Sequence, residues 1–336
     1  MSQTSQHPQG PTLFVADADV AALAEWPAAV AALRDAYSRP IAPEMVPPRV
    51  MARGAGFWLR GLFAVSPSGR YVGCKLISAS PRIRRASYLV ALFDQQTMDL
   101  AALIDGSRLT GLRTAATAAV AVDLLAPHKP LRVAVIGSGF EARGLLEALL
   151  ATREVESVRV FSPTDASRER FAASFREQGV AIQAVPEARA AVEGADLVFC
   201  AARSRDESPV LRGAWLEPGM TVVSIGSTLP EQREVDAQTM ARAALVVADM
   251  PEEVLHETGD ALAAAAEGID VGAKLVALAD VAGGKPGLRR RPEDIVLYKS
   301  VGGALQDVVI AEMLLLKAQA EGRYLTMPAT IQTIDK

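Results

Sequence analysis

The chain has 336 residues, of which 50% are hydrophobic and 22% are charged, and its formal net charge is −4. This length is enough for two domains with separate cores, and the composition excludes an intrinsically disordered chain. The acidic balance provides no basic face for nucleic acid, and no apolar run reaches the ~18 residues that a membrane-spanning helix needs. Because residues 1–10 also lack the layout of a signal peptide, we expect a cytoplasmic protein that binds neither nucleic acid nor membrane.

The first part of the chain predicts an α+β unit. Residues 1–12 are expected to lack regular structure, and the apolar spacing over 17–37 predicts a helix. Four prolines between residues 40 and 48 indicate an extended or looped segment. Turn residues then separate several strand-like runs, which predicts an antiparallel sheet followed by an alanine-rich helix. The predicted elements are strands 57–64, 71–78, 87–93 and 101–104, a turn at Asp105-Gly106 and a helix over 109–125.

From residue 131 the pattern changes to alternating strands and helices, which is typical of a parallel, doubly wound sheet. Strands are predicted at 131–136, 157–162, 180–185, 196–201, 220–225, 244–248 and 295–299, and helices at 140–151, 165–177 and 187–194. A last helix over 304–320 follows Gly302-Gly303 and is placed to fold back onto the first unit.

Cysteine and histidine are scarce. Cys74 and Cys200 fall in separate predicted strands and suit neither a disulfide nor a metal site, so we expect both to be buried apolar residues. Only three histidines occur. We therefore expect no metal centre and no Ser–His–Asp triad.

The strongest local signal is the stretch 131–142, where a β-branched strand breaks into a glycine turn and then a helix. This context is the one in which a G-x-G-x-x-A motif indicates dinucleotide binding. Gly137 permits the tight turn, Gly139 lets the backbone approach a pyrophosphate, and Ala142 lets helix and strand pack closely. A glycine turn without a ligand is the alternative. The predicted site comprises Gly137, Ser138, Gly139, Phe140, Glu141 and Ala142, at a helix N-terminus that favours phosphate.

The second βα turn bears on the choice of cofactor. Sites for NAD usually end the second strand with an acidic residue that binds the ribose diol. Here the strand ends in Ser162-Pro163-Thr164, and Asp165 follows where it could instead cap the next helix. Ser162, Thr164 and Arg168 suit a 2′-phosphate. NADP(H) is therefore favoured, with NAD(H) as the alternative.

Several motifs together resemble the ornithine cyclodeaminase/mu-crystallin family. They are Gly73-Cys74-Lys75, Leu109-Thr110-Gly111-Leu112-Arg113-Thr114-Ala115-Ala116-Thr117, the glycine turn, Trp215…Pro218-Gly219…Ile225-Gly226-Ser227…Arg233-Glu234-Val235-Asp236, and Lys299-Ser300-Val301-Gly302 with Gln306-Asp307. The resemblance implies an α/β fold in which a doubly wound Rossmann domain (129–302) is inserted in an α+β substrate-binding and dimerisation domain (1–128 plus 303–336). It also implies a homodimer joined through the first-domain sheets, with the active site in the cleft.

The resemblance places substrate-binding cations at Arg49, Lys75 and Arg113, with Thr114 added to the cofactor-binding set. An imino or amino acid carries a carboxylate, and guanidinium groups recognise carboxylates bidentately. Lys75, between guanidinium groups and partly desolvated, is expected to have a lowered pKa and to donate a proton to a substrate nitrogen or accept one. Ser87 either binds the substrate carboxylate or is an ordinary strand residue.

One departure from the family concerns the reaction. After Ile225-Gly226-Ser227 the cyclodeaminases carry an Asp that acts on the substrate amine, and this chain has Thr228. A hydroxyl can hold a ligand, but it cannot act as a carboxylate base near pH 7. The leading hypothesis is therefore an NAD(P)H-dependent reductase of 2-imino acids, or an amino acid dehydrogenase in reverse. The alternatives are an ornithine cyclodeaminase and a non-enzymatic, mu-crystallin-like ligand carrier.

Overall fold

The structure, a computed structural model, describes residues 10–176, 178–204, 206–285 and 291–334. The chain forms two compact units, Met1–Arg113 with Gly303–Lys336, and Thr114–Gly302. The first division falls within a helix, α3 (Gly106–Leu125), and not at the 128/129 boundary expected from the prolines that follow it. Those prolines mark where the helix ends, whereas the change of unit occurs inside the helix.

The first unit is built on a seven-stranded sheet in the order β15-β1-β6-β5-β4-β3-β2. From β2 to β6 each strand pairs antiparallel with the next, as predicted, and β1 joins β6 in parallel. The strands are β1 Leu13–Val15, β2 Val50–Gly54, β3 Phe57–Val65, β4 Tyr71–Ser80, β5 Arg85–Asp94, β6 Leu100–Asp105 and β15 Leu325–Thr326. The helices are α1 Asp17–Leu23, α2 Trp26–Ser38, the first half of α3, and α11 Ala304–Glu321.

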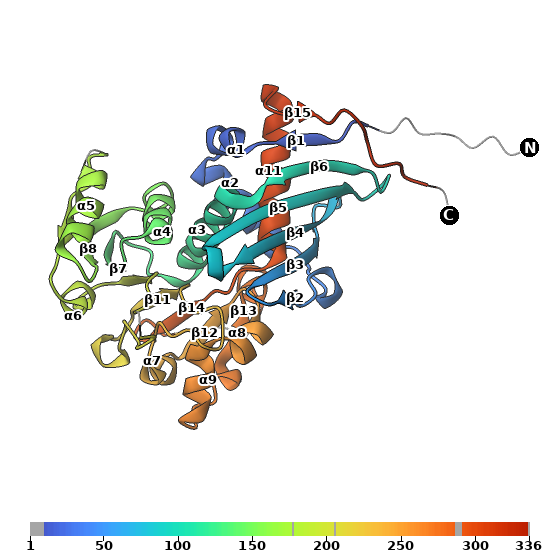
Figure 1. Cartoon of the computed structure of the whole chain (residues 1–336). Helices are drawn as coiled ribbons and strands as arrows, with labels where there is room; N and C mark the ends of the chain where they lie inside the picture. The colour runs from blue at the N-terminus through green and yellow to red at the C-terminus, as the bar shows by residue number, and fades with distance from the viewer. Residues whose placement is uncertain (1–9, 177, 205, 286–290, 335–336) are drawn as a thin grey trace, which may run out of the picture. The chain divides into compact units, whose positions relative to one another are not determined.

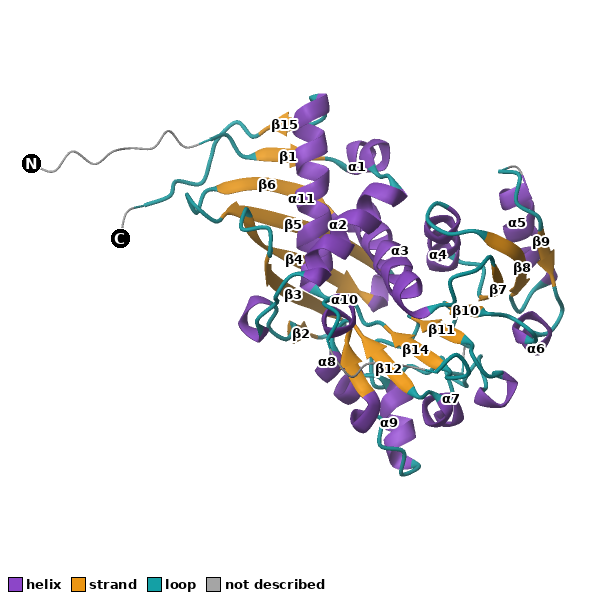
Figure 2. Cartoon of the chain, turned by 180° about the vertical axis from the view of Figure 1, so that it is seen from behind, coloured by secondary structure: helices purple, strands orange, loops and turns teal. Residues whose placement is uncertain are grey.

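Helix α11 packs on β3, β4 and β5 and is itself contacted by α1 and α2. Figures 1 and 2, seen from opposite sides, both place α11 against the same face of this sheet. Because side chains alternate along a strand, one set of strand residues packs under α11, and we call this the helix face. The other set points to the opposite face, where Phe57, Leu59 and Phe63 are 61%, 47% and 41% exposed.

Several details of the first unit differ from the sequence-based expectation. The helix expected over 17–37 is two helices, because Pro27 lies in the first turn of α2 and favours a new helix start there. Strands β1 and β2 were not expected, since one is short and the other follows a proline-rich stretch. Residues 105 and 106 form no hairpin turn: β6 runs into α3, and the Asp105 carboxylate accepts the Ser107 N–H at 2.9 Å. Residues 1–9 of the expected irregular end lie outside the described residues.

The second unit contains an eight-stranded sheet in the order β13-β12-β14-β11-β10-β7-β8-β9. All of its pairings are parallel, which confirms the predicted doubly wound sheet. The strands are β7 Leu131–Ile136, β8 Val155–Phe161, β9 Ile182–Ala184, β10 Leu197–Cys200, β11 Thr221–Ser224, β12 Leu245–Ala248, β13 Leu275–Ala277 and β14 Val296–Lys299. The central strands are almost wholly apolar because both faces are covered.

The helices of this unit are α4 Phe140–Leu150, α5 Asp165–Arg176, α6 Ala188–Val192, α7 Ala237–Arg242, α8 Pro251–Glu257, α9 Gly259–Ala266 and α10 Leu278–Ala282. The first three match predicted helices, and α8 contains His256, which was expected in a helix. Helices α7, α9 and α10 and strand β13 were not expected, because each is short. Cys200 is buried in β10 as expected, and Cys74 in β4 is only partly buried. Within the part of the chain that the structure describes, no helix is long and apolar enough to cross a bilayer.

An ion pair holds together the starts of β7 and β10. The Asp196 carboxylate accepts hydrogen bonds from the Arg132 backbone N–H at 3.0 Å and from its guanidinium at 3.0 and 2.9 Å, and Lys129 Nζ lies 2.9 Å away. Burial raises the pKa of Asp196, but the hydrogen bonds from Arg132 and Lys129 outweigh it and hold this pKa well below its usual range.

We expect Asp196→Asn to lower the stability of the protein by about 1–3 kcal/mol at pH 7, because charged hydrogen bonds are lost. A carboxylate whose folded pKa is depressed stabilises the protein above its unfolded pKa of ~3.9, and this contribution is lost as pH falls through the folded pKa. The difference between variant and parent in urea unfolding should therefore shrink below about pH 4. Glu169→Gln, at an exposed position on α5, is the control. Equal midpoints at pH 7 would contradict the role.

Candidate functional site

The first cluster of candidate side chains lies in the first unit, on the helix face of the sheet. Lys75 projects from the middle of β4, is 1% exposed, and donates a hydrogen bond from Nζ to Asp307 Oδ1 at 2.9 Å. Asp307 lies in the first turn of α11 and is 0% exposed. The Lys75 ammonium also lies 5.5 Å from the centroid of the Tyr88 ring on β5, within the range of a cation–π contact.

Arg113 joins the same cluster from α3. It is 9% exposed, its Nη1 donates to Gln306 Oε1 at 2.8 Å, and its Nε lies 3.2 Å from Asp307 Oδ1. Gln306 in turn donates to the Tyr37 hydroxyl at 3.0 Å. Two consecutive residues of α11 therefore fix the positions of both cations, and the structure brings together two of the three cations that the sequence singled out.

The carboxylate of Asp307 changes the expectation for Lys75. From the sequence, the pKa of Lys75 was expected to be lowered by desolvation and by neighbouring guanidinium groups, which both disfavour the ammonium form. A carboxylate at 2.9 Å acts in the opposite direction and favours the charged form. The sequence contained Asp307 in a quoted motif, but nothing in the spacing placed it beside Lys75. Lys75 Nζ is therefore held in place by the Asp307 carboxylate.

The remaining predicted residues of the first unit lie differently. Arg49 is half-buried and directly precedes β2, whose first residue pairs with Gly61. Extending this register by one residue sets Arg49 opposite Leu62, which pairs with Lys75. Ser87 pairs with Ser78, on the face opposite to Lys75, and is exposed. The residue of β5 that accompanies Lys75 is therefore Tyr88 and not Ser87.

In the second unit, the glycine turn has the geometry that a dinucleotide requires. Gly137 follows β7 with φ +113°, and a Cβ there would meet the Ala201 carbonyl oxygen at 2.5 Å. Gly139 is the N-cap of α4, and a Cβ there would meet no atom within 4 Å. Ala142 is 0% exposed against the sheet. The space at the N-terminus of α4 is therefore open to a phosphate, which fits the cofactor.

The second βα turn lies beside the first. Ser138 Oγ donates to Ser162 Oγ at 2.9 Å, and Arg168 Nη1 donates to the Ser162 carbonyl at 3.1 Å. Asp165 begins α5, is 87% exposed, and pairs with Arg168. Thr164 donates to Ser167 Oγ at 2.7 Å. The tip of β8 thus carries hydroxyls and a guanidinium. Thr114, the other residue expected to bind the cofactor, is buried in α3.

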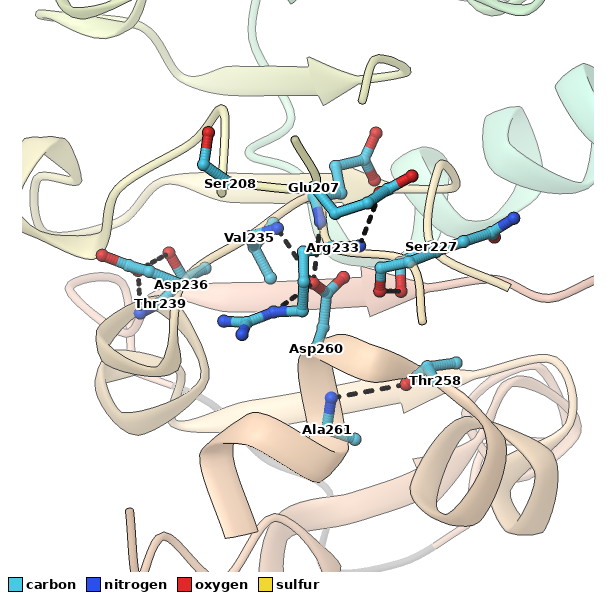
Figure 3. Close-up of polar contacts among 12 residues, drawn as sticks. Glu207, Ser208, Ser227, Arg233, Val235, Asp236, Thr239, Thr258, Asp260 and Ala261 are labelled. Carbon is cyan, nitrogen blue, oxygen red and sulfur yellow. Dashed lines mark hydrogen bonds and ion pairs between the residues drawn. The ribbon is translucent and has the colours of Figure 1, made fainter. Parts of the chain in front are cut away.

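The loop after β11 carries Thr228 and is held by its own side chains. Both the N–H and the hydroxyl of Thr228 donate to Gln232 Oε1, at 2.9 and 3.2 Å, and Ser227 donates to the Gln232 carbonyl at 2.6 Å. Asp260 accepts the N–H groups of Glu234 and Val235 at 2.8 and 3.2 Å, as Figure 3 shows for Val235. The Thr228 hydroxyl is thus part of the loop's own hydrogen bonding.

A buried charge network supports this loop, and sequence reasoning gave it no role. Glu234 accepts hydrogen bonds from the N–H groups of Ala202 and Gly226 and from Ser224, at 2.9, 2.8 and 2.6 Å. Lys299, at the end of β14, donates to Ser224 Oγ at 2.8 Å and pairs with Asp260 at 3.0 Å. Burial raises the pKa of Glu234, while Lys299 and Ser224 act against this. The feature of the sequence that could have indicated this network is Lys299, a lysine at the end of an otherwise apolar strand.

Among the described residues, no group of three or more His, Cys, Asp or Glu side chains is placed to hold a metal ion. The described candidate groups are two cations and a carboxylate in the first unit and an open glycine turn in the second.

Comparison with known proteins identifies the family. Residues 47–322 match the model of the ornithine cyclodeaminase/mu-crystallin family. This chain belongs to that family. A Δ1-pyrroline-2-carboxylate reductase of Bacillus cereus is 31% identical over 77% of this chain and 76% of its own length. The mouse ketimine reductase mu-crystallin is 32% identical over 67% of each chain.

Solved structures of family members have the same fold. The Thermococcus litoralis Δ1-pyrroline-2-carboxylate reductase, in complex with NADH and L-proline, superimposes with a TM-score of 0.84, is 25% identical, and covers 94% of this chain and 100% of its own. A probable ornithine cyclodeaminase from Bordetella pertussis has a TM-score of 0.81 at 31% identity, with 92% of this chain and 98% of that one covered. The resemblance and the α/β fold class predicted from the sequence are both confirmed.

Proposed function

We propose that this protein is an NAD(P)H-dependent reductase of 2-imino acids, or ketimines, which transfers a hydride to C2 of a carboxylate-bearing imine. The observation that carries the proposal is the buried cluster in which Asp307 holds Lys75 and Arg113. Such a cluster suits a substrate whose carboxylate is bound by a guanidinium group and whose adjacent imine nitrogen must gain a proton. The curated relatives are named as reductases of pyrroline-2-carboxylate and ketimines, which supports an oxidoreductase acting on C–N bonds.

The chemistry divides between the two units. The bound cofactor supplies the hydride that reduces C2. Arg113, whose guanidinium is fixed by Gln306 and Asp307, binds the substrate carboxylate, with Arg49 as a second cation. Lys75 donates the proton that the nitrogen gains, and it recovers a proton from solvent after the amino acid leaves. In the reverse direction Lys75 accepts the proton as the amino acid is oxidised. The substrate partner is thus a small imino or amino acid.

For the cofactor we favour NADP(H), with NAD(H) as the alternative. The tip of β8 carries Ser162, Thr164 and Arg168 in place of an acidic side chain on the ribose diol, and its one nearby carboxylate, Asp165, pairs with Arg168. The solved relative in complex with NADH supports a nicotinamide dinucleotide in general. A lower dissociation constant for NADPH than for NADH is the expected result, and the opposite order would reverse the choice.

For the assembly we propose a homodimer joined through the sheets of the first unit. The sheet face opposite to α11 exposes Phe57, Leu59 and Phe63, which form an apolar surface on an otherwise mixed sheet. Burial of such a surface is a usual driving force for stable association.

A cyclodeaminase reaction would require a base on the substrate nitrogen. Thr228 occupies the position of the family's Asp, and its hydroxyl donates to Gln232. We therefore expect net oxidation of one NAD(P)H per imino acid reduced, and no proline from ornithine. The measurement follows NAD(P)H absorbance with imines formed from 2-oxo acids and ammonium, and separately assays proline and ammonia after incubation with ornithine and catalytic NAD+. Many turnovers of ornithine per cofactor would restore the cyclodeaminase, and binding without any turnover would indicate a ligand carrier.

A side chain at Gly139 should occupy the space where a pyrophosphate is proposed to lie. Gly139→Val is expected to abolish dinucleotide binding with the fold intact, because a Cβ there meets no protein atom and the N-cap backbone is extended. The measurement is the rise in melting temperature on addition of NADPH. Gly139→Ala, which adds only a methyl group, is measured beside it. An unchanged ligand-induced shift in the valine variant would show that the cofactor site is misplaced.

Removal of the Arg113 guanidinium should lower kcat/KM for every substrate that carries a carboxylate. Truncation of an Arg that holds a buried carboxylate costs about 2–5 kcal/mol, which corresponds to a loss of roughly 30-fold to several-thousand-fold in kcat/KM. Cofactor affinity should stay nearly unchanged. Arg108→Ala, on the same helix but at an exposed pair with Asp17, is the control. Unaltered kinetics in Arg113→Ala would exclude the role, and Arg113→Lys tests whether the bidentate fork is required.

A further inference from the structure

A cavity of about 210 Å³ lies in the first unit, between α2, α11 and the turn that joins β3 to β4. Helices α2 and α11 contact each other, and Figures 1 and 2 both show them side by side. Most of the cavity wall is apolar, with Ala32 and Ala36 from α2 and Val309, Met313 and Leu316 from α11. The proposed reaction uses none of these residues.

The carboxylate of Glu312 lines the same cavity from α11. Glu312 is only 8% exposed, and its Oε2 accepts hydrogen bonds from the hydroxyls of Ser66 and Ser68 at 2.8 and 2.9 Å. Its other oxygen, Oε1, accepts no hydrogen bond from the part of the chain that the structure describes. Because an ionised carboxylate has about four acceptor sites, Glu312 retains an acceptor for a further donor.

The charge of Glu312 is also not neutralised within the protein. A buried charge is costly unless it is both paired and hydrogen-bonded, and the two serine hydroxyls supply hydrogen bonds without a positive charge. Within the described ranges, Glu312 forms no ion pair. The cavity's other carboxylate, Asp35, is exposed and already pairs with Arg39 at 2.9 Å. The cavity therefore combines apolar walls with one buried negative charge.

This cavity is separate from the cluster around Lys75. Glu312 follows Asp307 by five residues on α11, which corresponds to about 7.5 Å along the helix and about 140° around it. The two carboxylates therefore leave α11 on different sides. Val309 and Leu316, three residues before and four residues after Glu312, lie on its side of the helix, and both line the cavity.

We propose that this cavity binds a small primary amine in its ammonium form. The ammonium group donates to Glu312 and neutralises its charge, and the hydrocarbon part of the ligand packs between α2 and α11. An ammonium group carries three donors and no acceptor, which suits the carboxylate and the apolar walls. An apolar cavity of about 150 Å³ holds benzene, so this one has room for a ring with an aminomethyl group.

Three ligands of similar size and different charge test the proposal by calorimetry near pH 7. They are benzylamine, a cation, benzyl alcohol, which is neutral, and benzoate, an anion. The parent protein should bind benzylamine about 10- to 150-fold more tightly than benzyl alcohol, the range expected for a charged hydrogen bond. Benzoate should not bind, because its charge repels that of Glu312.

Two variants test the charge and the space separately. Glu312→Gln keeps an acceptor for the two serines but removes the charge, so the affinity for benzylamine should fall about 10- to 150-fold and that for benzyl alcohol should change little. Ala32→Leu keeps the charge and fills the cavity with a side chain that suits a helix, so both ligands should bind more weakly. Glu321→Gln, at an exposed position near the end of α11, is the matched control and should match the parent.

The melting temperature of each variant, measured without ligand, shows whether it is folded. Equal binding of benzylamine and benzyl alcohol by the parent, or no binding of the amine at millimolar concentration, would overturn the proposal. So would a folded Glu312→Gln or Ala32→Leu variant that retains the parent's affinity for benzylamine. None of these measurements involves oxidation of NAD(P)H, so their outcome is independent of the proposed function.

Discussion

The Asp307 carboxylate joins three elements of the first unit through charge. It accepts a hydrogen bond from Lys75 on β4 and lies 3.2 Å from Nε of Arg113 on α3, while it is itself buried in α11. Burial of either cation alone would be costly, and loss of one partner from a buried pair typically costs about 3–5 kcal/mol. The position of α11 on the sheet and the positions of Lys75 and Arg113 are therefore set by the same contact.

The second unit also contains a buried cluster of charges, but there the carboxylates outnumber the cations. There one lysine, Lys299, lies between two buried carboxylates, Glu234 and Asp260, and all three side chains are 0% exposed. The carboxylates hold backbone N–H groups at the ends of β10 and β11 and in the following loop. Buried charges thus fix the backbone where a doubly wound sheet binds its cofactor, at the carboxyl ends of the strands.

The fold of the family does not decide the reaction, because function is determined by the residues of the site. In this chain the deciding residues are few. In the reaction that we propose, Lys75, held by Asp307, donates the proton, whereas the Thr228 hydroxyl, which donates to Gln232, provides no carboxylate base. We propose that these two positions distinguish a reductase from a cyclodeaminase on one scaffold.

The parallel sheet and the glycine turn could be predicted from the sequence because they depend on local periodicity and on a short motif, whereas Lys75 and Arg113 were singled out through the resemblance to the family. The surroundings of these residues depend on the tertiary structure. Asp307 is 232 residues from Lys75, and no spacing rule brings the two together. The register of β4 and β5 places Ser87 on the face opposite to Lys75, and the Tyr88 ring lies 5.5 Å from the Lys75 ammonium. A shift of one residue in a strand exchanges its faces, so residue pairing in a sheet is settled only when the whole sheet is formed.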